Sequence, residues 1–350
     1  MGSVWDPFML TLTGGFAPMT NGLRLGLGGA PLGNLFHAVS ETAAQGVLQA
    51  ALADGCQTFD TAPHYGHGLS EQRFGQAFRH HADTHPVHGL RLSSKVGRLL
   101  TPAHDAARDQ LNFYNILPFN QHWDYSASGV RQSVFDSLQR MGLARLDTVF
   151  VHDCCPVCHG SQYPAVLHQV VNEALPELQR LKAQGLVGQI GIGVNVVQVC
   201  LDVLRATDLD CILLAGRYTL IDHSALAELL PLCEARGVRI AIGGAFNSGI
   251  LATGVRQNGH SPLFNYEQAP AAWVQKVAAV EAVCEQFAVP LRAAALQFPL
   301  AHPCVDVVLA GAQTLAHWHD AVAMMAHPIP AAFWAALRDQ DLIPAAAPTP

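Results

Sequence analysis

Residues 41–66 read ETAAQGVLQAALADGCQTFDTAPHYG and hold one complete helix-to-strand unit. Apolar side chains recur at helical spacing over residues 41–54, and the Asp54-Gly55 pair supplies the glycine that commonly ends a helix in a left-handed conformation. Residues 57–61 are a short apolar run that finishes close to a carboxylate, which is typical of a buried strand leading into a polar turn. The stretch therefore predicts an amphipathic helix, a tight stop and a strand.

The same unit recurs along the chain. Strands are expected at residues 23–29, 57–61, 91–96, 147–152, 188–194, 211–216, 238–243 and 305–310. Helices are expected at residues 41–54, 71–78, 127–141, 164–184, 196–206, 224–235, 271–287 and 315–326. Strands that alternate with helices favour parallel pairing, and eight such units favour a closed barrel because an open sheet would leave two unpaired edges. No Gly-x-Gly-x-x-Gly motif follows the first strand, which argues against an open dinucleotide-binding sheet.

We therefore predict the α/β class and a (β/α)8 TIM barrel, with residues 1–350 forming a single domain. The barrel is expected at about residues 23–326, and the Ala/Pro-rich tail at residues 343–350 is expected to fray. Three irregular segments follow predicted strand ends, where barrel enzymes build their sites: residues 99–125, 153–162 and 250–270.

Composition narrows the class of protein. Residues are 13% charged and 50% hydrophobic, which excludes a disordered chain. A net charge of -7 with 20 Lys and Arg leaves no basic surface for nucleic acid. No apolar stretch reaches the ~18 residues of a membrane span, and residues 1–20 lack the basic start and apolar core of a signal peptide. Nine cysteines, an odd number, fit reduced thiols, so we expect a cytoplasmic enzyme with a small-molecule substrate; its oligomeric state stays open.

Four polar residues fall at or just after the ends of consecutive predicted strands: Asp60, Tyr65, Lys95 and His152. Each alone has an ordinary explanation as a turn cap, a core side chain or a backbone partner. Together they form a coherent proton-transfer set, because an ammonium lowers the pKa of a nearby phenol and a carboxylate keeps that ammonium in place. A neutral imidazole can orient a substrate oxygen. The set predicts a site that interconverts an alcohol and a carbonyl.

The motifs that carry these residues resemble those of the aldo-keto reductase family, and the similarity runs from about Leu23 to Met325. They are Phe59-Asp60-Thr61-Ala62-x-x-Tyr65-Gly66, Ser94-Lys95 and Val151-His152-Asp153. The resemblance implies a barrel, a nicotinamide cofactor lying extended across the carboxyl-terminal rim, and a catalytic tetrad of Asp60, Tyr65, Lys95 and His152.

Residues 30–35, 215–220 and 246–251 look most like the branch of aldose 1-dehydrogenases (for L-fucose, D-threo-aldoses or L-galactose) and pyridoxal 4-dehydrogenases. That branch implies oxidation of a cyclic hemiacetal, such as L-fucose, L-galactose, D-arabinose or pyridoxal, to its lactone. Two alternatives remain: an NADPH-dependent aldehyde or ketone reductase, and a non-catalytic cofactor-sensing subunit.

Small residues after the last two predicted strands are suited to a dinucleotide, because backbone N–H groups can approach its pyrophosphate there. With Asn195, the expected contacts are Gly244, Phe246, Asn247, Ser248, Gly249, Gly311, Ala312 and Gln313. NADP-dependent members of the family present cations to the 2'-phosphate, whereas residues 305–326 contain no Lys or Arg, and His317 and His319 are poor substitutes. We therefore expect NAD rather than NADP.

One cluster, Cys154-Cys155-Pro156-Val157-Cys158-His159, matches the C-x-x-C-H pattern of haem attachment and resembles a zinc knuckle. Haem attachment would require export, and a structural zinc site needs four nitrogen or sulfur ligands, for which no second C-x-x-C exists. We expect a cysteine-rich loop near the substrate rim and no metal.

Overall fold

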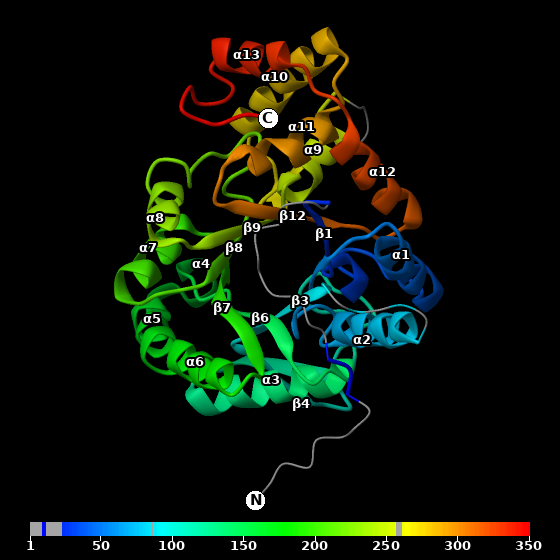
Figure 1. Cartoon of the computed structure of the whole chain (residues 1–350), viewed down its shortest axis with the longest axis vertical. Coiled ribbons are helices and arrows are strands. Elements are labelled where there is room, and N and C mark those ends of the chain that lie inside the picture. Colours follow the sequence, from blue (N-terminus) through cyan, green and yellow to red (C-terminus); the bar gives the residue numbers. More distant parts are fainter. Residues whose placement is uncertain (1–8, 12–22, 84, 86, 88, 257–260) are drawn as a thin grey trace, which may run out of the picture.

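The computed structural model describes residues 9–11, 23–83, 85, 87, 89–256 and 261–350 (Figure 1). Most of residues 1–20, for which no signal peptide is expected, and residues 257–260 of the third irregular segment lie outside this range. Within the described residues, no helix is both long and apolar enough to cross a membrane.

Eight parallel strands close into a barrel at the centre of the molecule (Figure 1). They are β1 (Leu25–Gly28), β2 (Thr58–Asp60), β3 (Arg91–Val96), β6 (Leu146–His152), β7 (Val187–Val194), β8 (Cys211–Ala215), β9 (Arg239–Gly243) and β12 (Val305–Gly311). Their order around the barrel is β1-β12-β9-β8-β7-β6-β3-β2, so each strand pairs with its neighbour along this series and β1 pairs with both β12 and β2. The predicted (β/α)8 TIM barrel is confirmed, with all eight predicted strands in it.

Helices surround the barrel. They are α1 (Glu41–Ala53), α2 (Leu69–Ala82), α3 (Ala127–Met141), α4 (Pro156–His159), α5 (Tyr163–Gln169), α6 (Leu175–Ala183), α7 (Val197–Ala206), α8 (Leu229–Arg236), α9 (Ile250–Thr253), α10 (Ala271–Phe287), α11 (Leu291–Gln297), α12 (Leu315–Ala326) and α13 (Ala331–Asp339). The helix expected at residues 164–184 is α5 and α6 joined through a π-helical segment, Val170–Ala174. The helix expected to start at residue 224 starts five residues later, because Glu228 has a non-helical backbone.

The first irregular segment contains a regular element that the sequence analysis missed. An antiparallel hairpin of β4 (Arg98–Pro102) and β5 (Phe119–Trp123) rises directly after β3. Gly97, with φ +103°, turns the chain there, and a Cβ on it would lie 2.3 Å from the Tyr125 ring. Only glycine allows this turn, which carries Arg98 to the rim of the barrel.

The expectation that residues 343–350 fray is wrong. Ile343 and Ala347 are buried in the core cluster. The Arg338 guanidinium at the end of α13 donates to the carbonyl of Ala347 and to Thr349 Oγ1 at 2.8 Å. Apolar burial and these side-chain bonds fix the tail against α13.

The barrel interior is filled by a compact apolar cluster of Phe150, Cys211, Leu213, Ala241, Val307 and Leu309. Packing is close between strands, since a Cβ on Gly191 of β7 would lie 2.0 Å from the carbonyl oxygen of Cys211 on β8. The interior therefore cannot be a channel, and the barrel offers its carboxyl-terminal rim as the place for a site.

Candidate active site

The barrel places the four predicted catalytic side chains on three neighbouring strands and one turn. Asp60 ends β2, Lys95 lies one residue before the end of β3, and His152 ends β6. These strands are adjacent and parallel, with Asp60 in register with Ser93 and Lys95 with Phe150. Tyr65 follows in the turn between β2 and α2. The carboxyl ends of the three strands thus bring all four residues to one part of the rim.

The Lys95 ammonium is fixed by three acceptors. Its Nζ lies 2.7 and 2.9 Å from the two carboxylate oxygens of Asp60 and 2.9 Å from the carbonyl oxygen of Thr61. Both side chains of the ion pair are buried, and Ser93 Oγ also donates to Asp60 at 2.6 Å. An ammonium has three N–H donors, all of which are used here, so Lys95 contributes a held positive charge rather than a transferable proton.

Tyr65 lies in the wall of the cavity beside this ion pair. Its ring is stacked on Phe113 with centroids 6.1 Å apart and is perpendicular to His152 at 6.0 Å. Lys95 Nζ lies 4.8 Å from the centre of the Tyr65 ring. The lysine therefore contacts the face of the phenol ring.

The net pKa shift of Tyr65 is opposite to the lowering expected from Lys95. Burial, followed by the negative charge of Asp60, raises the pKa of Tyr65 well above its ordinary value of 10. Asp60 neutralises the ammonium that was expected to stabilise the phenolate. Tyr65 is accordingly a neutral phenol at neutral pH.

His152 is neutral as well. Burial, then the positive charges of Lys95 and Arg98, lowers its pKa well below 6.5. Its Nδ1 is buried without a hydrogen-bond partner among the described residues, and its backbone carbonyl accepts a bond from Tyr125 Oη at 2.8 Å. The imidazole can therefore form a hydrogen bond with a substrate oxygen without carrying charge.

These residues surround a cavity of about 370 Å³. Tyr65, Lys95, His152 and Asn195 line it, while Asp60 stands behind Lys95. Its other lining residues include His64, Arg98, Phe113, Asp153, Cys158 and Tyr266. A volume of this order suits a small organic substrate.

An ion pair in this lining was missed by sequence reasoning. Arg98 Nη2 lies 2.8 Å from Asp153 Oδ2, and the same carboxylate oxygen is 3.6 Å from His152 Nε2. The guanidinium also lies 3.9 Å from the centre of the Trp123 ring. Asp153 has a left-handed backbone, φ +50°. Asp153 could have been suspected from its position directly after His152. Its partner, Arg98, could not, because the sequence analysis did not predict the hairpin.

Four of the expected cofactor contacts line one small hollow of about 30 Å³: Asn195, Gly244, Asn247 and Ser248. This hollow shares the lining residues Asn195, Ala215 and Tyr266 with the cavity of about 370 Å³, so the two lie side by side. Asn247 Oδ1 is buried with no partner among the described residues. The donor set and the unsatisfied amide oxygen fit a polar ligand that enters the catalytic cavity at one end.

The remaining expected contacts lie around this hollow or farther along the rim. Phe246 is half-buried against the core, and Gly249, with φ +104°, precedes α9. Gly311 is exposed at the end of β12 and Ala312 is buried beside it. Gln313 Nε2 donates to the carbonyl of Leu35 at 2.9 Å, next to β1. A ligand that contacts both the residues of the small hollow and the residues after β12 must extend along the rim, as a dinucleotide can.

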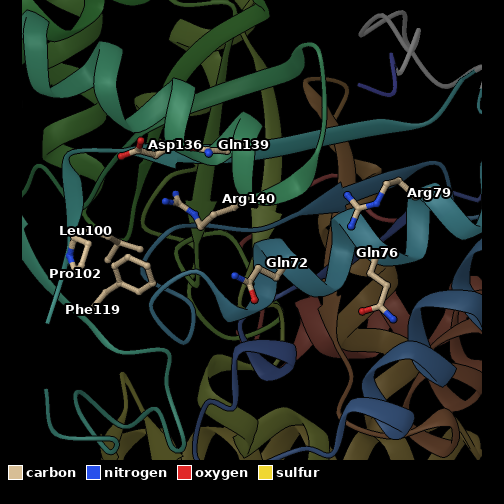
Figure 2. Close-up of a pocket in the computed structure, with 9 residues that line it drawn as sticks. All are labelled: Gln72, Gln76, Arg79, Leu100, Pro102, Phe119, Asp136, Gln139 and Arg140. Carbon is tan, nitrogen blue, oxygen red and sulfur yellow. The ribbon is translucent and has the colours of Figure 1, made fainter. Parts of the chain in front are cut away.

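A larger cavity of about 600 Å³ lies away from this rim. Figure 2 shows it between α2, α3 and the β4–β5 hairpin, with Gln72 and Gln76 on one side and Phe119 on the other. Its two arginines are engaged, since Arg79 donates to the carbonyl of Met141 at 2.6 Å and Arg140 binds the carboxylate of Glu71 at 2.6 Å. It contains none of the predicted site residues.

Comparisons with known proteins match most of the chain. The model of the Aldo/keto reductase family matches residues 24–341. The chain is 37% identical over 324 residues to the pyridoxal 4-dehydrogenase of Microbacterium luteolum, covering 91% of this chain and 94% of that protein. It is 37% identical over 325 residues to the D-threo-aldose 1-dehydrogenase of a Pseudomonas species, with the same shares of 91% and 94%. The holo form of an aldo-keto reductase from Bacillus halodurans has the same fold, with a TM-score of 0.69 at 22% identity over 96% of this chain and 98% of that one.

Proposed function

The chain belongs to the aldo/keto reductase family, and from this premise we propose that it oxidises the cyclic hemiacetal of an aldose or a pyridoxal-like aldehyde to its lactone. Membership makes it an NAD(P)-dependent oxidoreductase. The substrate class is supported by the two relatives at 37% identity, which are named for pyridoxal and for D-threo-aldoses. The observation that carries the proposal is the cavity of about 370 Å³ on which Tyr65, Lys95 and His152 converge.

The chemistry follows from the four side chains. His152, held neutral, forms a hydrogen bond with the reacting oxygen of the substrate. Tyr65 exchanges the proton of that oxygen, and the Asp60–Lys95 ion pair fixes the charge beneath its ring. A nicotinamide dinucleotide, which Asn195, Gly244, Asn247 and Ser248 would hold, would supply the acceptor for the hydride of the anomeric carbon. Oxidation requires the phenol of Tyr65 to lose its proton, so the raised pKa of Tyr65 predicts that the oxidation rate rises with pH.

We also propose that NAD is preferred to NADP. Residues 305–326 contain no Lys or Arg. Two arginines outside this segment are candidate partners of a 2'-phosphate, and Arg292 forms a two-fold bond with the carboxylate of Asp320 on α12, at 2.8 and 3.0 Å. Arg256 is paired with Glu285 at 2.5 Å. Both cations are thus engaged by carboxylates rather than free for a 2'-phosphate.

The direct test is a panel of L-fucose, L-galactose, D-arabinose and pyridoxal with NAD and with NADP, followed by the absorbance of the reduced nicotinamide. Tyr65→Phe is the matched control, because it removes one hydroxyl and little volume. We expect turnover with at least one hemiacetal and a loss of roughly a hundredfold or more in the variant, the size typical of general acid–base catalysis. Near-normal turnover of Tyr65→Phe would show that another group moves the proton.

A second candidate, an NADPH-dependent aldehyde or ketone reductase, is favoured by one observation. A raised pKa keeps the phenol of Tyr65 protonated at neutral pH, which is the form that donates a proton when a carbonyl is reduced. Aldehyde reduction with kcat/KM well above that of every hemiacetal oxidation would select this candidate instead.

A further inference from the structure

Two cysteines next to the catalytic histidine occupy one short turn. Cys155 precedes α4 and Cys158 lies within it, and the N–H of Cys158 donates to the carbonyl of Cys155 at 3.1 Å. Residues three apart in a helical turn have Cα atoms roughly 5 Å apart, within the roughly 4.4–6.8 Å that a disulfide spans. The two sulfurs can therefore be joined without unfolding the turn.

The pair differs from the other cysteines of the chain. All nine cysteines lie in described residues and are free thiols, and only Cys158 is exposed. Burial raises the pKa of the others, for example to about 12 at Cys56 and Cys284. The neighbouring Cys158 thiol instead lowers the pKa of Cys155 to about 7, and the pKa of Cys158 is raised. Of the nine thiols, the one whose pKa lies near neutral pH therefore belongs to this pair.

The turn is joined to the active site on both sides. The N–H of Cys155 donates to the carbonyl of Asp153 at 2.8 Å, and Cys158 itself lines the catalytic cavity. The next residue, His159, has its Nε2 3.0 Å from Tyr125 Oη, the hydroxyl that donates to the carbonyl of His152. These contacts connect the turn to the wall of the cavity.

We propose that Cys155 and Cys158 form a redox-active dithiol, which a hydroperoxide converts to a disulfide in the wall of the catalytic cavity. The inference is independent of the substrate assigned above. The sequence analysis expected only a cysteine-rich loop here, and the proposed hydride transfer does not use these thiols.

The reaction balances with hydrogen peroxide as the oxidant. A thiolate of the pair attacks one peroxide oxygen, the O–O bond breaks, and the leaving hydroxide takes up a proton as water. The sulfenic acid so formed is attacked by the second sulfur; the S–S bond forms, the S–O bond breaks and a second water leaves. Two thiols are oxidised, both peroxide oxygens are reduced, and an added dithiol reverses the change.

The test treats the folded full-length protein with stoichiometric hydrogen peroxide, then unfolds it and alkylates the remaining thiols. Nine thiols are alkylated in the untreated chain, and we expect two fewer after peroxide, with full recovery after reduction by dithiothreitol. Mass spectrometry of the peptide that contains residues 154–159 should place the new bond between Cys155 and Cys158. This readout does not depend on enzyme activity, so it succeeds or fails separately from the proposed function.

Three variants sharpen the test. Cys155→Ser and Cys158→Ser should each abolish the reversible loss of two thiols, whereas Cys284→Ser, a buried cysteine on α10, should leave it intact. Two results would overturn the proposal: irreversible oxidation of Cys158 alone in the wild-type protein, or a peroxide-induced disulfide that persists in Cys155→Ser.

Discussion

Lys95 and Asp60 show how single residues fix the charge of this site. Both are buried, at 2% and 3% exposure, and each neutralises the other at 2.7 Å. In such a pair the loss of one partner costs far more than the pair itself contributes, because an uncompensated charge remains in the interior. The pair therefore constrains stability as well as chemistry.

We expect Lys95→Met to lower the free energy of unfolding by about 3–5 kcal/mol, the range for a broken buried ion pair. Adding Asp60→Asn should restore part of that loss, since the orphaned carboxylate is removed. Chemical denaturation of the two variants and the wild type measures both effects. Lys182→Met is the control, because its pair with Asp210 is 38% and 28% exposed and surface pairs contribute about 0–1 kcal/mol. Equal losses in Lys95→Met and Lys182→Met would contradict the role of burial.

His152 links the same electrostatics to pH. Its pKa is depressed in the folded protein, so below the ordinary value of 6.5 the unfolded chain binds more protons than the folded one. The stability contributed by neutral His152 is thus complete above pH 6.5 and is lost as pH falls. We expect the stability difference between wild type and His152→Gln to shrink between pH 7 and about pH 5, by at most ~1.4 kcal/mol per pH unit.

Comparing the two proteins at each pH is necessary because Asp147 titrates in the opposite sense. Burial raises the pKa of Asp147 to about 7, so the folded protein gains stability from it as pH falls. Asp147 is common to both proteins and cancels in the difference. If the stabilities of wild type and His152→Gln changed in parallel with pH, the pKa of His152 would not be lowered in the folded protein.

Close helix packing provides a test at the level of elements. Gly75 of α2 lies against the end of α3, and a Cβ there would be 2.3 Å from the carbonyl oxygen of Met141. Gly46 of α1 has open space instead, since its Cβ would meet only the Leu315 side chain at 3.9 Å. Gly75→Ala should destabilise by about 1–3 kcal/mol through overpacking, while Gly46→Ala should stabilise by about 0.5–1 kcal/mol through helix propensity. Thermal unfolding of the pair measures the contrast, and stabilisation by both changes would mean that α2 and α3 can separate without cost.

The elements also show what could be predicted from the sequence. Most barrel strands are short, largely apolar runs, and several follow a glycine that ends the preceding helix, so their number and order along the chain could be predicted. The β4–β5 hairpin could not, because its strands are half-exposed and carry no regular alternation. The hairpin brings Arg98, the first residue of β4, to Asp153, the residue after β6. Local sequence does not specify such a long-range contact.

For the predicted catalytic residues, the positions could be predicted from the sequence but the pKa of Tyr65 could not. The positions of Asp60, Lys95 and His152 follow from strand ends, and the barrel brings them together as expected. The direction of the Tyr65 pKa shift could not be predicted from residue types. It depends on the depth of burial and on whether the lysine charge is already neutralised, both of which are properties of the folded molecule.

The expected cofactor preference depends on where charges lie along the rim, and not only on the net charge of the molecule. The chain has a net charge of -7, and α12 adds the Asp320 carboxylate to a segment without Lys or Arg. A 2'-phosphate brought there would lose hydration and meet no free cation, whereas a ribose hydroxyl can bond to neutral groups. One charge-assisted hydrogen bond is worth roughly 1.5–3 kcal/mol, or about tenfold to a hundredfold in affinity.

We therefore expect wild-type kcat/KM to favour NAD over NADP, and two changes to narrow that preference by different routes. His317→Arg adds a cation to α12, while Asp320→Asn removes a negative charge and releases Arg292 from its two carboxylate bonds. Asp339→Asn, at the exposed end of α13, makes the same change in net charge elsewhere and should leave the preference unaltered. Steady-state kinetics with both cofactors at saturating substrate separates local from global electrostatics. A wild-type preference for NADP would require a cation from another part of the rim. If Asp339→Asn changed the preference as much as Asp320→Asn does, the preference would follow total charge rather than the Arg292–Asp320 contact.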